Sequence, residues 1–179
     1  SNEIMSNLDW LPTFLAAAGE PDVAGKLLKG HQAAGKTFKV HLDGYNFLPY
    51  LTGQEKKGPR DRYFYFSDDG NLLAMRYQNW KVHFMVQDQA GTLEIWQRQF
   101  RGLRTPYLFN LRTDPYEQAT ITSNTYWDWY FDRSFALYAL PDVVGEFLAT
   151  FEEFPPRQKA ASFTIDKALE MLQRPPGGK

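Results

Sequence analysis

The segment from residue 62 to residue 111 constrains the fold more than any other part of the sequence. Short apolar or aromatic runs alternate there with clusters of turn-forming residues. The expected strands are Arg62–Phe66, Leu72–Tyr77, Trp80–Val86, Thr92–Trp96 and Tyr107–Leu111, and the expected turns are 68–70, 78–79, 88–91 and 113–115. Strands of this length joined by tight turns predict a meandering antiparallel sheet.

A helical pattern lies near the start of the chain. Residues Asp9 to Gly19 predict a short helix, in which Asp9 caps the free N–H groups and Gly19 supplies a left-handed stop. Its apolar side chains fall on one face at helical spacing, so we expect that face to lie on a core. These side chains are Leu11, Phe14, Leu15 and Ala18.

The region between this helix and the sheet mixes short elements. We expect a second helix from Pro21 to Lys29, a polar loop over 30–36, and a half-buried strand from Thr37 to Leu42, where apolar and polar residues alternate. A turn at Asp43-Gly44 and a helical turn from Asn46 to Leu51 follow. The charged stretch 54–61 predicts a linker, which divides the chain into 1–56 and 57–179.

Aromatic helices follow the sheet. The pattern becomes helical at Tyr126, is interrupted by Pro141, and resumes from Asp142 to Phe151. A last amphipathic helix is expected from Phe163 to Leu172. Together the patterns predict an α+β fold, with a small antiparallel sheet of about four strands packed with helices.

Composition excludes several classes of protein. The chain has no cysteine, which excludes a thiol nucleophile, a cysteine zinc site and a disulfide framework. The formal net charge is −1 and the basic residues are dispersed, which argues against a nucleic-acid partner. No apolar run reaches the ~20 residues of a membrane span, and no signal peptide is recognisable. Periplasmic and cytoplasmic locations in a bacterium both stay open.

Residues suited to chemistry are scarce. Asp68-Asp69 precedes a glycine between two strands, which favours a hairpin over a metal pair. The histidines lack metal-ligand spacing, and no Gly-x-Ser-x-Gly elbow or glycine-rich phosphate loop is present. We therefore predict no catalytic and no metal-binding residue in this chain. His83, which shares a strand face with Lys81 and lies opposite Trp80, is singled out with these two neighbours as the edge of a substrate pocket.

The aromatic helices leave two interpretations open. Exposed rings such as Trp80, Trp96 and Trp127 would suit a stand-alone carbohydrate-binding module. Core or interdomain packing is favoured, because each large ring buries roughly 150–250 Å². A structural or oligomerisation module built on the helices between Tyr126 and Phe151 is the remaining alternative.

Four stretches of the chain carry a family resemblance. They are Asp9–Gly19, the segment DGYNFLPYLTG at 43–53, LAMR at 73–76 followed by WKVHF at 80–84, and LFNLRTDPYE at 108–117. In this order they resemble the C-terminal part of the arylsulfatases, members of the alkaline-phosphatase-like hydrolases. The segment Glu153–Lys159 is similar to that of a subset of bacterial sulfatases.

The resemblance implies hydrolysis of a sulfate ester. In such enzymes a formylglycine, made from the Cys or Ser of a Cys/Ser-x-Pro-x-Arg motif, is the nucleophile, and a calcium ion held by Asp and Asn balances the sulfuryl charge. This chain contains neither the Cys/Ser-x-Pro-x-Arg motif nor an acidic cluster that matches the calcium ligands. No catalytic or metal residue and no cofactor is therefore assigned to it. The resemblance places calcium and formylglycine in a missing N-terminal part.

The resemblance also gives each part of the chain an expected role. Residues 1–56 would be a helix–strand remnant of the large α/β catalytic domain, and 57–179 the antiparallel-sheet subdomain with its C-terminal helices. The chain begins at Ser1-Asn2 without an initiator Met, so we expect a fragment that is inactive alone. Its expected partners are the missing catalytic domain and the sulfate ester. The segment Ser1–Gly53 should then show an exposed apolar face or pair in a homodimer.

Overall fold

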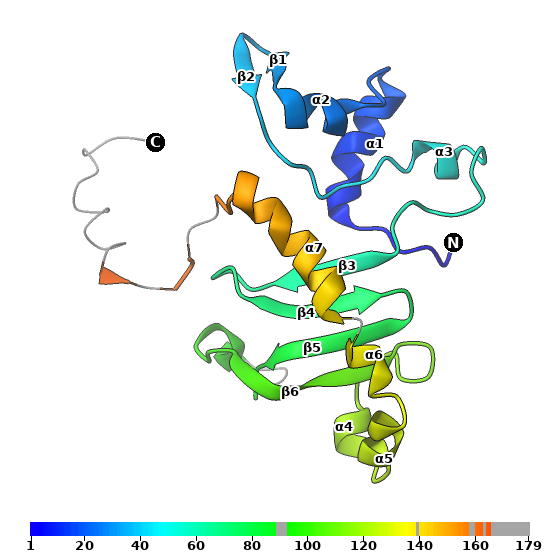
Figure 1. The fold of residues 1–179 in the computed structure, drawn as a ribbon, viewed down its shortest axis with the longest axis vertical. Coiled ribbons are helices and arrows are strands. Elements are labelled where there is room, and N and C mark those ends of the chain that lie inside the picture. Colours follow the sequence, from blue (N-terminus) through cyan, green and yellow to red (C-terminus); the bar gives the residue numbers. More distant parts are fainter. Residues whose placement is uncertain (89–92, 139, 158–159, 163, 166–179) are drawn as a thin grey trace.

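The centre of the molecule is a four-stranded antiparallel sheet in the order β3-β4-β5-β6. Its strands are β3 (Arg62–Phe66), β4 (Leu72–Tyr77), β5 (Trp80–Val86) and β6 (Arg101–Asn110). The structure is a computed structural model that describes residues 1–88, 93–138, 140–157, 160–162 and 164–165. Each strand pairs with the next along the chain, so the predicted meander and the α+β class are confirmed (Figure 1).

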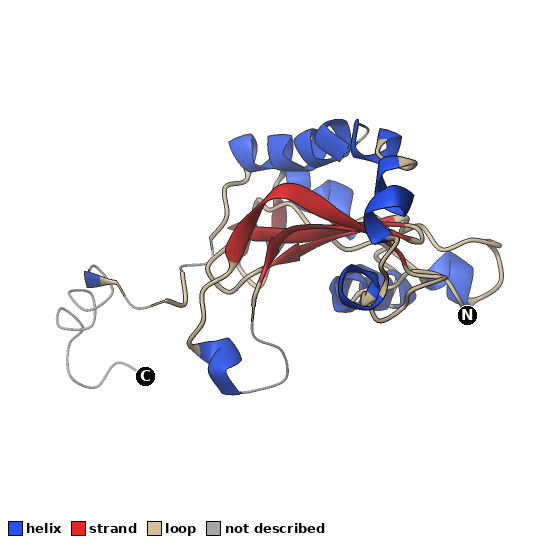
Figure 2. Ribbon diagram, turned by 90° about the horizontal axis from the view of Figure 1, so that it is seen from below, coloured by secondary structure: helices blue, strands red, loops and turns tan. Residues whose placement is uncertain are grey.

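Helices cover one face of this sheet. They are α4 (Ala119–Thr122), α5 (Tyr126–Phe131), α6 (Phe135–Tyr138) and α7 (Leu140–Glu153). Seen along the sheet they form a layer on one side of it (Figure 2). Pro141, expected to interrupt the helices, lies in the first turn of α7, where its missing N–H is tolerated.

Aromatic side chains join the helices to the sheet. The buried cluster between the helices and the sheet consists of Val82, Leu108, Tyr126 and Tyr130. The Phe64 ring of β3 stacks on Phe147 of α7, with ring centroids 4.1 Å apart. Because β6 is an edge strand, its outward backbone groups need partners, and the Tyr126 hydroxyl is the partner of both groups of Leu108. This hydroxyl accepts from the Leu108 N–H at 3.0 Å and donates to the Leu108 carbonyl at 3.1 Å.

The N-terminal segment forms a small lobe beside β3 (Figure 1). It contains η1 (Asn7–Asp9), α1 (Trp10–Ala17), α2 (Val23–Lys29), β1 (His31–Ala33), β2 (Lys36–Phe38) and α3 (Leu48–Leu51). The helix predicted over 9–19 is confirmed, and Gly19 adopts the expected positive φ of 99°. The Asp9 side chain makes no cap hydrogen bond to α1, so its predicted role was wrong.

The predicted loop and strand after α2 are corrected by the structure. Residues 30–36 were expected as loop, but β1 and β2 form a hairpin there, with positive φ at Ala34 and Gly35 in its turn. The strand expected to continue to Leu42 ends at Phe38. The chain leaves the hairpin because the Val40 N–H bonds the Leu27 carbonyl at the end of α2.

The apolar stripe of α1 points away from the rest of the described chain. Leu11 is 52% exposed and Phe14 is 64% exposed. The buried side of the helix carries Thr13, whose hydroxyl accepts the Phe47 N–H at 2.9 Å. The expected burial of the stripe is therefore wrong within this chain. The separate expectation of an exposed apolar face in this segment is confirmed.

The last predicted strands also differ. Thr92–Trp96 was expected as a strand, but residues Leu93–Trp96 form the 3-10 helix η2. β6 begins at Arg101 rather than Tyr107. Its first residues therefore pair with the end of β5, where Gly102 lies opposite Met85. The helix expected over Phe163–Leu172 and most of the turn at 88–91 lie outside the described residues.

Candidate functional site

Lys81 and His83 meet at one carboxylate on the sheet face that the helices leave uncovered. The Lys81 Nζ atom lies 2.7 Å from Oε1 of Glu117, and the His83 Nε2 atom lies 2.5 Å from its Oε2. Lys81 and His83 are two residues apart in β5, so their side chains point to the same side of the sheet, as predicted. All three side chains are partly buried, so this is a shielded charged cluster rather than a loose surface pair.

A turn directs Glu117 toward β5. Glu117 has a φ of 56°, in the left-handed region that non-glycine residues rarely adopt. The Asp114 carboxylate accepts the N–H groups of Gln118 at 3.0 Å and Ala119 at 2.8 Å, which fixes the chain after the turn. The sequence had indicated that Asp114-Pro115 shapes the exit from the strand, and these bonds show how. It had not indicated that Glu117, at the end of the same motif, joins the charged cluster.

The cluster keeps Glu117 ionised. Burial acts to raise the pKa of this carboxyl, but the close approach of the His83 ring and the hydrogen bond from Lys81 outweigh it, and the net pKa lies below the ordinary 4.5. The Lys81 ammonium also lies 4.6 Å from the centroid of the Tyr65 ring. The arrangement can hold charge in a fixed place, and it contains no activated nucleophile.

Trp80 lies on the other side of the sheet. Its indole packs on Trp129 of α5, with centroids 6.1 Å apart, in the helix-covered face. The structure thus brings Lys81 and His83 together and separates Trp80 from them. The His83 ring instead packs against Phe109, 5.0 Å away.

A buried ion pair joins the N-terminal lobe to the sheet. The Arg60 guanidinium donates to both carboxylate oxygens of Asp9, at 2.9 and 2.6 Å, and to the Asp43 carbonyl at 2.7 Å. The two side chains are 5% and 0% exposed. Sequence reasoning missed this pair, because its members are 51 residues apart. Gly44 follows Asp43 in the extended segment 39–45, called the strap below, where the Leu8 carbonyl leaves no room for a Cβ atom.

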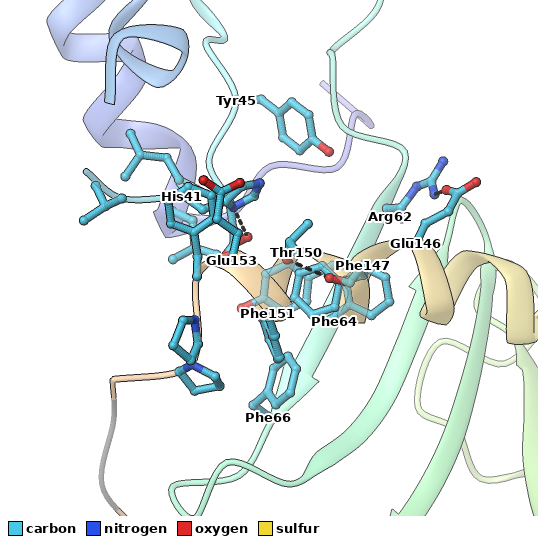
Figure 3. Close-up of a pocket in the computed structure, with 18 of the residues that line it drawn as sticks. His41, Tyr45, Arg62, Phe64, Phe66, Glu146, Phe147, Thr150, Phe151 and Glu153 are labelled. Atoms are coloured by element: carbon cyan, nitrogen blue, oxygen red, sulfur yellow. Dashed lines mark hydrogen bonds and ion pairs between the residues drawn. The ribbon is translucent and has the colours of Figure 1, made fainter. Parts of the chain in front are cut away.

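A groove of about 1230 Å³ lies between this strap, β3 and α7. Figure 3 shows that Phe64 and Phe147 face each other there, so each ring covers one face of the other. The charged groups on its rim also have partners within the chain, such as Lys39 with Glu153 at 2.7 Å and Arg62 with Glu146 at 3.4 Å. The groove separates the lobe from α7 and shows no catalytic arrangement.

The family model for the C-terminal region of aryl-sulfatase matches residues 58–172, well over half of the chain. The chain belongs to this family. It is 31% identical over 93 residues to human arylsulfatase A, a match that covers 50% of this chain and 15% of that protein. A crystal structure of PsFucS1 sulfatase from Pseudoalteromonas sp. matches with a TM-score of 0.47 and 23% identity, over 64% of this chain and 22% of that one. This sulfatase C-terminal region therefore spans a small part of the length of these relatives.

The residues of this sulfatase C-terminal region do not fit the catalytic groups of the family. The sequence has no Cys and no Ser-x-Pro-x-Arg motif from which formylglycine could be made. Among the described residues, no three His, Asp or Glu side chains gather as metal ligands would. Within the same residues, no helix has the length and apolarity needed to cross a bilayer.

The other side chains considered from the sequence have structural contacts. Asp69 accepts the Ser162 N–H at 2.7 Å beside the β3–β4 turn. His41 lies 3.1 Å from Asp43, and His31 begins the small hairpin. The aromatic block is divided, since Tyr126 and Tyr130 are core while Trp127 is half exposed.

Proposed function

We propose that this chain serves as the C-terminal region of a larger sulfuric ester hydrolase and supports its catalytic domain. The match to the family model over 58–172 carries the proposal. The nucleophile and the calcium ligands then belong to the region that precedes this one in the whole enzyme, since the residues here do not fit them. The chain by itself is inactive in this account.

The exposed face of α1 is the proposed contact with the catalytic domain. Trp10 stacks on Phe14 with centroids 5.2 Å apart, and both rings are exposed together with Leu8 and Leu11. A contiguous apolar face of this kind on a soluble domain marks a protein contact. In this account residues 1–56 are the end of the catalytic domain, and the exposed face of α1 packs on the rest of that domain.

Lys81 and His83 are proposed to border the substrate pocket of the assembled enzyme. The ion pair of Lys81 with Glu117 and the close contact of His83 with the same carboxylate hold two nitrogen-bearing groups on the uncovered face of the sheet. A sulfate group approaching this face would compete with Glu117 for the Lys81 ammonium. Lys81 would therefore favour binding of the ester, and Glu117 would weaken it.

Opposite substitutions test this role in the whole enzyme. Lys81→Met is expected to raise the KM for an aryl sulfate about tenfold, the loss of one charge-assisted hydrogen bond, with kcat little changed. Glu117→Gln is expected to lower KM. Lys39→Met, which removes an exposed ion pair on another part of the chain, is the matched control. An unchanged KM in both Lys81→Met and Glu117→Gln, with unchanged melting temperatures, would exclude a border role.

A further inference from the structure

Four exposed aromatic side chains line the outer side of α5 and α6. Trp127, Phe131, Phe135 and Tyr138 are 50%, 68%, 69% and 82% exposed. Their spacing of four, four and three residues places them on one face of a helical path. The turn between the helices continues that path, because the Arg133 N–H bonds the Tyr130 carbonyl and the Ser134 N–H bonds the Phe131 carbonyl. We call these four side chains the outer stripe.

Most of the outer stripe lies outside the core: Trp127 touches Tyr126 and Tyr130 edge-on at 5.1 and 5.5 Å, and Phe131 touches Tyr130 at 5.9 Å, while the larger part of the stripe's surface stays exposed. The opposite side of the same helices carries Tyr126, Tyr130 and Leu137, which pack on Val82 and Leu108. The outer stripe adds apolar surface on the order of 500 Å², since each large ring can bury roughly 150–250 Å². This is as large as the functional patches of ordinary monomers. The stripe is therefore a contact surface rather than a few scattered exposed rings.

We propose that the outer stripe binds the same stripe of a second copy of this chain, in antiparallel orientation. A two-fold axis requires each surface to be complementary to itself. The spacing of the stripe meets that requirement, because the intervals between successive rings are nearly the same whether they are counted from Trp127 or from Tyr138. An antiparallel pair sets Trp127 against Tyr138 of the second copy and Phe131 against its Phe135. Such a contact would bury on the order of 1,000 Å² in total, the lower bound of a specific interface.

The position and charge of the outer stripe favour this partner over others. It lies at the opposite end of the long axis from α1, the proposed contact with the catalytic domain (Figure 1). The exposed Asp128 and Asp132 are on the same helical path. Arg133, 4.0 Å from Asp132, offsets one of these two charges, so about one net negative charge per copy opposes the pairing. Arg133 is the one basic residue between 126 and 138, whereas an anionic membrane or a sulfated polymer would need a basic cluster. The inference does not depend on the proposed function.

The mass in solution tests the pairing. The purified chain at 50–100 µM (an order-of-magnitude range for a weak interface) is expected to sediment as a dimer. Phe131→Asp and Phe135→Asp are expected to give monomers with an unchanged near-ultraviolet circular dichroism spectrum. Phe14→Asp, on the exposed face of α1, is the matched control and should leave the dimer intact. A monomeric wild-type chain, or a dimer lost in Phe14→Asp and retained in Phe131→Asp, would overturn the proposal.

Cysteine cross-linking tests the orientation, because the chain has no cysteine of its own. A mixture of the Trp127→Cys and Tyr138→Cys chains is expected to form a disulfide-linked dimer on mild oxidation. Each variant alone should not, since identical residues at the ends of an antiparallel stripe lie about 16 Å apart and a disulfide needs Cα atoms within about 7 Å. Rapid cross-linking of either variant alone, without the mixed product, would contradict the antiparallel arrangement.

Discussion

At the scale of single residues, Asp9 makes the polar contacts that hold the N-terminal lobe to the sheet. Besides the two bonds from Arg60, its carboxylate accepts the N–H groups of Ser6 and Tyr45, both at 2.8 Å. Burial is the largest single influence on the pKa of the Asp9 carboxyl, and taken alone it would raise that pKa. The hydrogen bonds and the charge of Arg60 together outweigh burial, so the pKa lies below the ordinary 3.8.

Asp9→Asn is expected to lower the free energy of unfolding by about 3–5 kcal/mol, because it leaves the buried Arg60 charge without its counter-ion. Urea denaturation followed by circular dichroism measures this change. Asp88→Asn is the matched control: Asp88 also holds an arginine through both oxygens, at 3.1 and 2.8 Å, but that pair is exposed. Equal effects of the two substitutions would show that burial of the Asp9 pair is unimportant.

The lowered pKa values of Asp9 and Glu117 set the expected pH dependence of stability. A carboxyl whose pKa is lower in the folded state binds fewer protons there than in the unfolded chain. Its stabilisation is therefore present above the ordinary values of 3.8 and 4.5 and is lost as the pH falls below them. Urea midpoints measured from pH 6 to pH 2 should fall below about pH 4.5, and less steeply in Asp9→Asn. An identical slope in that variant would contradict the assignment to Asp9.

At the scale of elements, the tyrosines of α5 protect the edge strand β6. Tyr126 makes two hydrogen bonds to Leu108, and burial raises its pKa to about 12. Tyr130 makes one bond, to the Pro106 carbonyl at 2.9 Å. The helix layer therefore does two things for the sheet: it covers one face, and it pairs the outward backbone groups of Leu108 and Pro106 in β6.

Tyr126→Phe is expected to destabilise the fold by about 1–3 kcal/mol, since it leaves the Leu108 N–H and carbonyl without their partner. Native-state hydrogen exchange should show faster exchange at the Leu108 amide. Tyr130→Phe provides the control, because it removes a bond to Pro106 and leaves the Leu108 amide paired. Unchanged exchange at Leu108 in Tyr126→Phe would mean that the hydroxyl does not protect the strand.

Local patterns predicted the elements with strong local signals. β3, β4 and β5 have the predicted bounds, because alternation and turn residues are read within a few positions. η2 was mistaken for a strand, since Leu93, Ile95 and Trp96 have strand-like side chains and only the pairing of β5 with the start of β6 decides the matter. Contacts between residues far apart in the sequence could not be predicted either, because local patterns do not show which distant segments come together. The Asp9–Arg60 pair and the place of Glu117 beside Lys81 depend on the folded chain.

At the scale of the whole molecule, two apolar surfaces lie far apart. One is the exposed face of α1 in the N-terminal lobe, and the other is the outer stripe of α5 and α6 at the opposite end (Figure 1). The sequence indicated an excess of aromatic residues but not which rings stay outside the core. A scaffold with two separate contacts could hold a catalytic domain at one end and a second copy at the other.

Both surfaces fit the proposal that this region contributes to a hydrolase through contacts. Exposed rings such as Phe14 and Phe131 add nothing to the core of this chain. Their burial by other parts of an assembly would stabilise that assembly by the apolar area removed from water. The proposed enzyme therefore depends on contacts made by this region rather than on chemistry within it.

The most direct test is the rate of aryl sulfate hydrolysis with calcium, measured for this chain alone, for the catalytic region that precedes it, and for the two together. The account predicts no turnover above buffer by this chain, and higher turnover by the mixture than by the catalytic region alone. Calcium-dependent turnover by the purified chain on its own would contradict it.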